Sequence, residues 1–468
     1  MTFLVPIIIG SSKDLTHANK IKNKLSLFGI SSDIRISSAH KATEYVMGIL
    51  NNYEKDVYVP VIITCAGKSN ALSGVVDSNT SLPVIACPPI TKETMFDLYS
   101  STSMPTDVCP MVVLGPENAG LAAAKICGLQ CTDIRHSVLD LHHNNTNKLI
   151  IEDIQQKYND DNLRHDLLPS CVVDSREEYG NSYNESMQFM RSGKIRDLYL
   201  KPNSENMFLV GTDKLSSFDR VITSIPRKGE ILNKVTKWWF DRTVDIVPNH
   251  YVSHEGRSME VKKTEVIMIE FVMRSYLTGS TITSIWKNYE KGMRTYCGHQ
   301  LPNGMVRNQP LAEPLLTPTT KGEVDELISK EEILDQCIMT HKEWDTCATY
   351  AHALFKRGQE LASRRGLILV DTKYEFGKLP NGDIILIDEL HTPDSSRFWI
   401  KHSYQQRFNN QQEPEMIDKE FIRKWVKSQY PDPYSMKPDE FGITDEMRLK
   451  TTNRYLQLYN IITGEEVV

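Results

Sequence analysis

Residues 5–14, VPIIIGSSKD, decide the fold of the first part of the chain. The uninterrupted apolar run at 5–9 is typical of a strand that is buried on both faces. Gly10 ends this run, and the apolar residues between Ala18 and Phe28 then recur at helical spacing. A buried strand that leads through a short polar loop into an amphipathic helix indicates a parallel sheet covered by helices.

The same alternation continues to residue 128. Further apolar runs predict strands at 32–36, 59–64, 83–86 and 111–114, and the Ala-rich stretch at 117–127 predicts a helix that ends at Gly128. Polar loops follow the first three strands, with the sequences GSSKD at 10–14, SSAHK at 37–41 and AGKSN at 66–70. Ligands bind at the carboxyl ends of the strands in such sheets, so we expect these loops to form one site.

A change of composition separates this region from the rest of the chain. Residues 144–184 are rich in Asn, Asp, Lys and Glu, with a helical piece at 149–158. We interpret them as a helix that extends the first domain and then a linker. This gives a first domain at 1–165, a linker at 166–186 and a second domain at 187–468. Longer strands, hairpins and helices after residue 187 indicate an α+β architecture.

The overall composition narrows the class of protein. The 468 residues are 40% hydrophobic and 24% charged, which is typical of a globular chain with more than one core. A net charge of −6 disfavours non-specific binding to nucleic acid, and no apolar run approaches the roughly 20 residues of a membrane span. The first residues lack the pattern of a signal peptide, and the 9 cysteines lack zinc-site spacing. We therefore expect a cytoplasmic enzyme with reduced thiols and no nucleic-acid or membrane partner.

Each candidate residue of the first site also has a structural interpretation. Ser11 and the amides of a helix amino terminus can hold a phosphate, whereas an aspartate placed like Asp14, directly before a helix, is more often an N-cap than a ligand. His40 lies in a loop beyond a strand end, where an imidazole can transfer a proton near neutral pH. A single histidine can also be structural.

A hairpin carries the clearest signal in the second part, because Asn381-Gly382 lies between apolar runs at 367–376 and 384–390. Its charged residues are Asp371, Lys373 and Glu375, which alternate on one strand, and Asp388 and Glu389 on the return strand. Burying charges is costly, yet the apolar run before the last two indicates a buried strand. Carboxylates at such a place suit Mg²⁺, which binds through one or two of them together with nucleotide phosphates. The alternative is a solvated charged face.

Polar loops occur elsewhere in the second part, at residues 192–197, 211–219, 274–280 and 311–321. In the first of them, a glycine followed by Lys194 and Arg196 on a hairpin can cover nucleotide phosphates. For each loop the alternative is a simple surface connection.

Five motifs across residues 5–128 resemble, in order and spacing, those of the aminoimidazole ribonucleotide (AIR) carboxylase family: GSSKDL, SSAHK, CAGKSNALSG, SLPVIACPP and GPENAG. They fit a three-layer, flavodoxin-like α/β domain. His40-Lys41 and the stretch GKSNAL at 67–72 resemble the subfamily that takes CO₂ directly. Lys13 and Lys68 depart from the residues that are usual there. The alternatives are therefore a mutase that rearranges an N-carboxylated substrate, or an inactive domain.

This resemblance implies a set of site residues. His40 and Lys41 would be catalytic, with His40 transferring the proton that leaves the ring carbon. AIR would be bound by Ser11, Asp14, Ser38, Gly67, Lys68, Ser69 and Asn70. The carboxylation would need neither ATP nor biotin, and members of the family assemble as octamers.

Six motifs across residues 187–468 resemble the SAICAR synthetase family: GKIRDLY, TDKLSSFD, MRSYLTGS, EPLLTPTTK, DTKYEFG and LIDELHTPDSSRFW. This resemblance implies an ATP-grasp-like α+β fold, with ATP and Mg²⁺ as cofactors. ATP would be bound by Lys194, Arg196, Met268 and Glu270, and the metal by Glu375 and Asp388. The ribonucleotide and aspartate would be bound by Asp219, Arg274, Ser280, Lys321, Asp371, Lys373, Asp394, Ser396 and Arg397.

Together the two resemblances imply a bifunctional enzyme of purine biosynthesis, in which the product of the first domain is the substrate of the second. Its small-molecule partners would be AIR, CO₂, aspartate and ATP, and the chain would form a homo-oligomer. The alternative from another class is a regulatory nucleotide-binding scaffold without turnover. The acids Glu375 and Asp388 argue against the scaffold.

Overall fold

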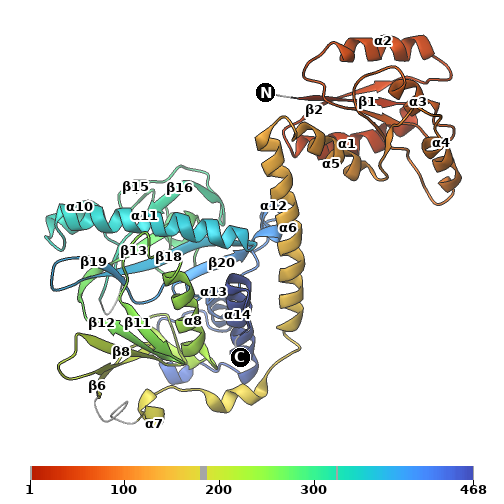
Figure 1. The fold of residues 1–468 in the computed structure, drawn as a ribbon. Helices are drawn as coiled ribbons and strands as arrows, with labels where there is room; N and C mark the ends of the chain where they lie inside the picture. Colours follow the sequence, from red (N-terminus) through yellow and green to blue (C-terminus); the bar gives the residue numbers. More distant parts are fainter. Residues whose placement is uncertain (1–2, 180–186, 323–324, 467–468) are drawn as a thin grey trace. The chain divides into compact units, whose positions relative to one another are not determined.

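The computed structural model describes residues 3–179, 187–322 and 325–466. The chain forms two compact units, Met1–Asn145 and Thr146–Val468 (Figure 1). Each unit has a hydrophobic core of its own.

The first unit is a parallel five-stranded sheet with the strand order β2-β1-β3-β4-β5. Its strands are β1 (Leu4–Ile9), β2 (Ser31–Ile36), β3 (Ile62–Cys65), β4 (Val84–Ala86) and β5 (Met111–Val112). Helices α1 (Leu15–Ser26) and α5 (Pro116–Cys127) pack on one face, and α2 (Thr43–Glu54) and α3 (Ala71–Asp77) pack on the other. The predicted three-layer, flavodoxin-like domain is therefore confirmed.

The predicted boundary between the domains differs from the one in the structure. Helix α6 (Thr132–Lys157) contains the predicted helix at 149–158 and crosses the division between Asn145 and Thr146. Ile151 near its end is buried in the core of the second unit. The predicted domain end at 165 and the linker at 166–186 thus come after the division. Part of that linker forms η3 (His165–Ser170) and α7 (Ser175–Tyr179), and its residues 180–186 lie outside the described ranges.

The second unit is built on two antiparallel sheets, which confirms the predicted α+β arrangement. One has the order β11-β12-β8-β7-β6, and the other has the order β16-β13-β18-β19, with β17 beside β13 and β20 beside β18. The strands of the first are β6 (Gln188–Ser192), β7 (Arg196–Leu200), β8 (Asn206–Gly211), β11 (Tyr251–Glu255) and β12 (Ser258–Lys262). Those of the second are β13 (Glu265–Tyr276), β16 (Pro310–Leu316), β17 (Thr319–Thr320), β18 (Leu367–Lys378), β19 (Ile384–Ile387) and β20 (Ser396–Ile400). Two small hairpins pair β9 (Lys214–Ser217) with β10 (Arg220–Ser224) and β14 (Thr295–Tyr296) with β15 (His299–Gln300).

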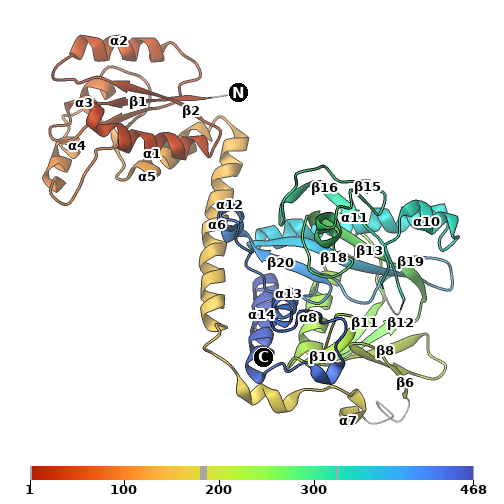
Figure 2. The same cartoon turned by 180° about the vertical axis from the view of Figure 1, so that it is seen from behind.

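Helices cover these sheets and close the core of the second unit. They are α8 (Lys228–Phe240), α9 (Ile285–Glu290), α10 (Lys330–Asp335), α11 (His341–Arg364), α12 (Lys401–Asn409), α13 (Glu420–Gln429), η4 (Pro438–Glu440) and α14 (Asp445–Thr463). Helix α11 packs along β18, and α8 lies beside α14 (Figures 1 and 2). Capping boxes at Ser329 and Thr340 fix the starts of α10 and α11.

The predicted hairpin is present as β18 and β19, and Gly382 in its turn has a φ of 87°. One detail of the prediction is wrong. Asp388 and Glu389 were expected on the return strand, but β19 ends at Ile387. Asp388 takes a left-handed conformation with a φ of 65°, because the chain leaves the sheet there.

Candidate active sites

The structure brings the three polar loops of the first unit to one edge of its sheet. Ser37 N donates to Ile9 O at 2.9 Å, and Gly10 N donates to Cys65 O at 2.8 Å, so the loops start side by side. Gly10 lies so close to Ala66 that an added Cβ would be 3.3 Å from the Ala66 Cβ. The three loops therefore lie together at one edge of the sheet, as predicted.

In the first loop, Ser11 is turned toward Asp14. The Ser11 hydroxyl donates to Asp14 Oδ2 at 3.2 Å and accepts from Lys13 N at 3.3 Å. Asp14 occupies the N-cap position of α1, but its side chain makes no capping hydrogen bond. The carboxylate of Asp14 therefore faces the loop rather than the helix that follows.

In the second loop, the chain turns sharply after β2. Ser38 O accepts from Lys41 N at 3.2 Å and from Ala42 N at 2.9 Å, which closes the turn. Ser38 is half-buried, whereas the side chains of His40 and Lys41 are exposed to solvent. An exposed imidazole at this edge is accessible to a ligand.

In the third loop, Lys68 takes a left-handed conformation with a φ of 56°, which is unfavourable for a residue other than glycine. Side chains from a segment about thirty residues later hold it there. Lys68 N donates to Asp97 Oδ2 at 3.0 Å, and Ser100 Oγ donates to Lys68 O at 2.7 Å. Asn70 N donates to Ser100 Oγ at 2.9 Å, and Asn70 Nδ2 donates to Ser101 Oγ at 2.8 Å. Asn70 also caps α3 through Ser73 N.

The segment that makes these bonds consists of η2 (Met95–Leu98) and α4 (Tyr99–Thr102). We call Asp97, Ser100 and Ser101 the loop clamp. Gly67 and Ser69 lie in the loop itself, the first half-buried and the second exposed. The loop clamp could not be predicted from the sequence, because no local pattern links it to the loop.

A thiol pair also lies at this edge and was not predicted. Cys65 ends β3, and Cys87 directly follows β4. His17 Nε2 lies 3.2 Å from Cys87 Sγ. The hydrogen bond with Cys65 lowers the pKa of Cys87 to about 6; burial opposes this, and His17 adds to it.

In the second unit, a cavity of about 600 Å³ lies over β13 and β18, at the turn between β6 and β7. Most of the residues predicted for the second site line it. They are Lys194, Arg196, Asp219, Glu270, Arg274, Lys321, Asp371, Lys373, Glu375, Asp388, Asp394, Ser396 and Arg397.

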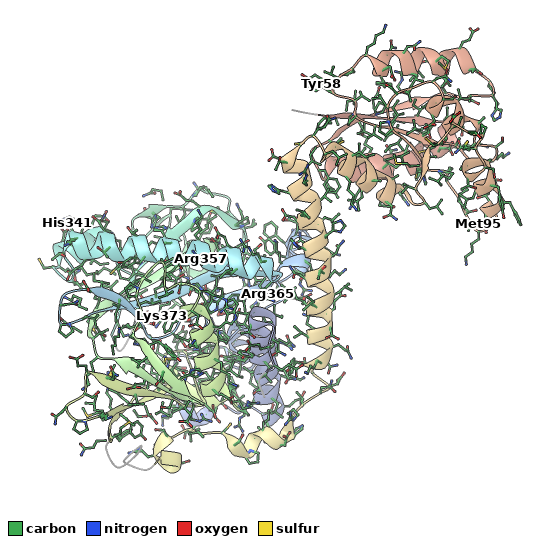
Figure 3. The ribbon with its side chains drawn as sticks, viewed as in Figure 1. Tyr58, Met95, His341, Arg357, Arg365 and Lys373 are labelled. Atoms are coloured by element: carbon green, nitrogen blue, oxygen red, sulfur yellow. The ribbon has the colours of Figure 1, made fainter. Side chains whose placement is uncertain are left out.

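The register of β13 and β18 explains why several of these charges meet. Glu270 is paired with Glu375, and Arg274 with Asp371, across the two strands. Lys373 lies between these pairs on β18, where it is labelled in Figure 3. Because side chains alternate along a strand, all of them face the cavity, as the predicted alternation required.

At one end of the cavity, cations and carboxylates alternate. Arg196 binds Asp388 and also donates to Glu389 Oε2 at 3.0 Å. Lys373 Nζ lies 2.7 Å from Glu270 Oε1 and 2.8 Å from Glu375 Oε1. Lys321 binds the other oxygen of Glu375.

The pKa values follow from this arrangement. Burial alone would lower the pKa of Lys373, but the charges of Glu270 and Asp388 outweigh it and raise the value. Burial raises the pKa of Glu389, against the opposing charge of Arg196. Glu389 is not among the residues that the resemblance implies for this site, but it lines the cavity and contacts Arg196.

At the other end, buried ion pairs hold the arginines. Arg397 Nη1 lies 2.6 Å from Asp371 Oδ2, and Arg274 Nη1 lies 3.5 Å from the same oxygen. Arg397 also lies 3.3 Å from Glu420. Burial opposes ionisation of Glu420, but Arg397 and Arg423 outweigh it and lower the pKa to about 2.

Asp394 is enclosed by three residues that the sequence analysis missed. Lys228 Nζ lies 2.9 Å and Lys419 Nζ 3.4 Å from Asp394 Oδ2, and the Tyr455 hydroxyl donates to Asp394 Oδ1. Burial lowers the pKa of Lys419 to about 8, although Asp394 works against it. Lys228 and Tyr455 come from α8 and α14, far from Asp394 in the sequence, so no local pattern could have found them.

Two predicted residues do not line the cavity, as far as the described ranges show it. Met268 lies on β13 with its side chain exposed, and its carbonyl accepts from Lys321 N at 3.1 Å. Ser280 is buried directly before Thr281, which does line the cavity. Asp219, in contrast, does line the cavity. It lies in the turn between β9 and β10, with a φ of 61°.

Residues 3–179, 187–322 and 325–466 contain no group of three or more His, Cys, Asp or Glu side chains that could hold a metal ion by itself. Within the same ranges, no helix is both long enough and apolar enough to cross a membrane.

Comparisons with known proteins agree with this division of the chain. Residues 189–437 match the family model for SAICAR synthetase, and residues 4–148 match the family model for AIR carboxylase.

Individual relatives resemble the second unit. A phosphoribosylaminoimidazole-succinocarboxamide synthase of Legionella pneumophila is 44% identical over 305 residues, which cover 64% of this chain and 93% of that protein. A chloroplastic enzyme of the same name from Vigna aconitifolia is 52% identical over 238 residues, which cover 50% of this chain and 69% of that one. A structure of SAICAR synthase from Saccharomyces cerevisiae, complexed with SAICAR, is 28% identical with a TM-score of 0.51. The match covers 61% of this chain and 98% of that chain.

Proposed function

Because the chain belongs to the SAICAR synthetase family and also carries an AIR carboxylase domain, we propose that it catalyses two consecutive steps of purine biosynthesis. The first unit carboxylates 5-aminoimidazole ribonucleotide (AIR) with CO₂. The second unit joins the carboxylated product to L-aspartate, with hydrolysis of ATP, and gives SAICAR. The observation that carries this proposal most directly is the charged cavity over β13 and β18, which contains thirteen of the residues implied for the ligase.

We propose that His40 moves the proton in the first step. The aminoimidazole ring is an enamine, so its carbon can attack CO₂ without ATP or biotin, and one proton must then leave that carbon. His40 is exposed at the edge where the three loops meet, with Lys41 beside it. Binding of AIR is assigned to Ser11, Asp14, Ser38, Gly67, Lys68, Ser69 and Asn70. Within this set Ser11 and Asp14, together with Lys41, are assigned to the ribose phosphate.

In the second step, the substrate carboxylate is a poor electrophile and must be activated. ATP phosphorylates it to an acyl phosphate, the aspartate amine attacks the acyl carbon, and phosphate leaves. Lys194 and Arg196 lie at the turn between β6 and β7, where they can hold the ATP phosphates. The contact of Glu270 with Lys373 supports a role for Glu270 in orienting that lysine.

The remaining cavity residues are assigned to the ribonucleotide and aspartate. Arginines bind phosphates and carboxylates through paired hydrogen bonds, which suits Arg274 and Arg397. The group also contains Asp219, Ser280, Lys321, Asp371, Lys373, Asp394 and Ser396. The strand at residues 268–270 is assigned to adenine, and the side chain of Met268 on it is exposed.

The residues present fit Mg²⁺ bound together with ATP. Glu375 and Asp388 are paired with Lys321 and Arg196, and phosphates that attract these two cations would free the carboxylates for the metal. Mg²⁺ usually takes only one or two protein carboxylates beside phosphates, so a three-residue cluster is not required. When bound, the ion neutralises charge on the transferring phosphoryl group.

The direct use of CO₂ is proposed from His40-Lys41 and residues 67–72, and it has a simple test. AIR is incubated with labelled bicarbonate and without ATP. We expect labelled carboxylated product. If product forms only from the N-carboxylated compound, the first unit is a mutase.

We further propose that the chain is a cytoplasmic homo-oligomer, an octamer by family resemblance. All 9 cysteines are free thiols, which suits a reducing compartment. Several large apolar side chains of the first unit are exposed, among them Phe96 at 85% and Val57 at 84%, which suits contacts between copies. Light scattering coupled to gel filtration measures the number of chains per particle.

A further inference from the structure

Residues 171–176 take part in the packing of the second unit rather than serving only as a connection to it. The stretch at 171–176 was expected to be linker, because it is polar and follows a region rich in Asn and Asp. In the structure it makes two sets of hydrogen bonds with the buried carboxylates of Asp213 and Asp197. We call residues 171–176 the strap.

The first set of bonds joins the strap to Asp213. Val172 N donates to Asp213 Oδ2 at 2.8 Å, and Asp213 N donates to Val172 O at 2.7 Å. Asp213 is fully buried, and its other oxygen accepts from Gly229 N at 3.0 Å. The carboxylate therefore ties the strap to the start of α8.

The second set joins the strap to Asp197 on β7. Asp197 Oδ2 accepts from Ser175 N at 2.9 Å and from Ser175 Oγ at 2.7 Å. The Ser175 hydroxyl also lies 2.9 Å from the hydroxyl of Tyr199. Ser175 and Asp197 are both fully buried, so water cannot replace these bonds.

Asp197 connects the strap to the cavity. Its other oxygen, Oδ1, accepts a hydrogen bond from the Ser192 hydroxyl. Ser192 lines the cavity and begins the turn that carries Lys194 and Arg196. Gly193 N donates to Arg196 O at 2.7 Å, which closes that turn. The two oxygens of one buried carboxylate thus hold the strap on one side and the turn on the other.

We propose that Ser175 of the strap is a positioning residue for the turn at 193–195, acting through Asp197 and Ser192. The consequence for ATP rests on the function proposed above, because it requires that Lys194 and Arg196 hold the nucleotide phosphates. The strap then belongs to the ligase: it pre-organises the phosphate-binding turn before ATP arrives.

We expect loss of the Ser175 hydroxyl to weaken nucleotide binding more than it weakens binding of SAICAR. Ser175→Ala leaves a buried carboxylate oxygen with one hydrogen bond fewer. We expect it to weaken binding of the β,γ-imido analogue of ATP about ten-fold. Binding of SAICAR, assigned to residues on β13, β18 and β20, stays within about two-fold of wild type in the absence of nucleotide.

The experiment compares full-length wild type with Ser175→Ala, Asp197→Asn and the matched control Ser170→Ala. Ser170 is an exposed serine of η3, whose hydroxyl donates to Leu167 O at 2.8 Å within the same short helix. Calorimetry measures binding of the ATP analogue and of SAICAR separately. Hydrogen exchange, measured without nucleotide, reports on the backbone amides at 193–195.

The proposal predicts faster exchange at 193–195 and weaker analogue binding in Ser175→Ala and Asp197→Asn, with Ser170→Ala unchanged. Wild-type exchange and wild-type analogue binding in both of the first two variants would overturn it. Equal loss of analogue and SAICAR binding would also overturn it, because the strap would then only stabilise the unit. If Ser175→Ala does not fold, Asp197→Asn decides. If wild type fails to bind the analogue, the proposed ligase function is wrong, and the exchange data alone decide the role of Ser175.

Discussion

Asp388 combines two properties at the scale of a single residue. Its carboxylate pairs with Arg196 at the cavity, and its backbone is left-handed with a φ of 65°. Asparagine tolerates that conformation well, so Asp388→Asn removes a charge without adding backbone strain. The substitution is therefore a clean test of the carboxylate.

We expect Asp388→Asn to lower the ligase rate about 100-fold or more, because the metal and the ATP phosphates would be misplaced. Glu375→Gln should act in the same way. The measurement is ligase turnover on supplied carboxylated ribonucleotide, at saturating and at low Mg²⁺. The matched control is Asp383→Asn at the exposed tip of the same hairpin. A solvated ion pair would cost under about 1 kcal/mol, so ligase activity within a few-fold of wild type would remove Asp388 from the metal site.

His40 gives the second prediction at this scale. We expect His40→Ala to reduce carboxylation by about 10²–10⁴-fold, since proton transfer would be lost. Ligation of supplied carboxylated substrate should continue at its normal rate. His143→Ala, an exposed histidine on α6, is the control. Near-normal carboxylation by His40→Ala would contradict the assignment.

At the scale of elements, the loop clamp on η2 and α4 holds Lys68 in a conformation that is unfavourable by itself. Ser100 bonds both Lys68 O and Asn70 N. We expect Ser100→Ala to lower carboxylation about ten-fold, because the loop loses both of its hydrogen bonds with Ser100 and its residues shift. Ligase activity should not change.

The clamp variant is measured beside Ser103→Ala, an exposed serine just after α4. The ratio of kcat/KM for AIR between the two variants isolates the effect of the clamp. Equal activity of the two variants would show that the loop keeps its shape without Ser100.

We expect the free energy of unfolding to depend on pH through Asp418, which lies between β20 and α13. Asp418 is buried there and accepts from Phe398 N and Glu420 N, each at 2.7 Å. Burial raises the pKa of Asp418 to about 7, from a usual 3.8. Between these two values the folded state holds a proton that the unfolded state has released. The contribution of Asp418 to the free energy of unfolding is therefore present at about pH 4 and is lost as the pH rises to 7.

We expect the free energy of unfolding of the second unit to fall by a few kcal/mol from this cause over that range. The comparison is urea unfolding of wild type and Asp418→Asn at several pH values. The free energy of unfolding of wild type, relative to that of Asp418→Asn, should fall as the pH rises from 4 to 7. A constant difference between pH 4 and 7 would show that Asp418 is ionised throughout.

These elements also show what could be predicted from the sequence. The strands and loops of the first sheet follow from local patterns, as in VPIIIGSSKD, and the hairpin follows from Asn381-Gly382 and its flanking apolar runs. The alternation of Asp371, Lys373 and Glu375 was enough to place them on one face. In each case the information lies within about ten neighbouring residues.

The rest depends on contacts between distant segments. Nothing near Lys228 or Tyr455 in the sequence indicates that they enclose Asp394, and nothing near Ser175 indicates a bond with Asp197. The polar composition of residues 166–186 predicts a linker, yet it could not show that residues 171–176 are tied to the buried carboxylates of Asp197 and Asp213. The predicted domain boundary lies after the division between Asn145 and Thr146.

At the scale of the whole molecule, the chain contains two units with separate cores. Each unit has its own cluster of site residues, one at the edge of a parallel sheet and one in a cavity over antiparallel strands. The product of the first proposed reaction is the substrate of the second, which gives the fusion its chemical logic. Losing one activity should therefore leave the other intact, as the variants above require.

The most direct test of this account is a stepwise assay with the full-length chain. AIR and bicarbonate are supplied first, then aspartate, and finally Mg-ATP, with product analysis after each addition. We expect carboxylated AIR before ATP is present, no change on adding aspartate, and SAICAR with equimolar ADP once Mg-ATP is added. Failure to form carboxylated AIR without ATP, or failure to convert supplied carboxylated AIR to SAICAR with Mg-ATP and aspartate, would contradict the account.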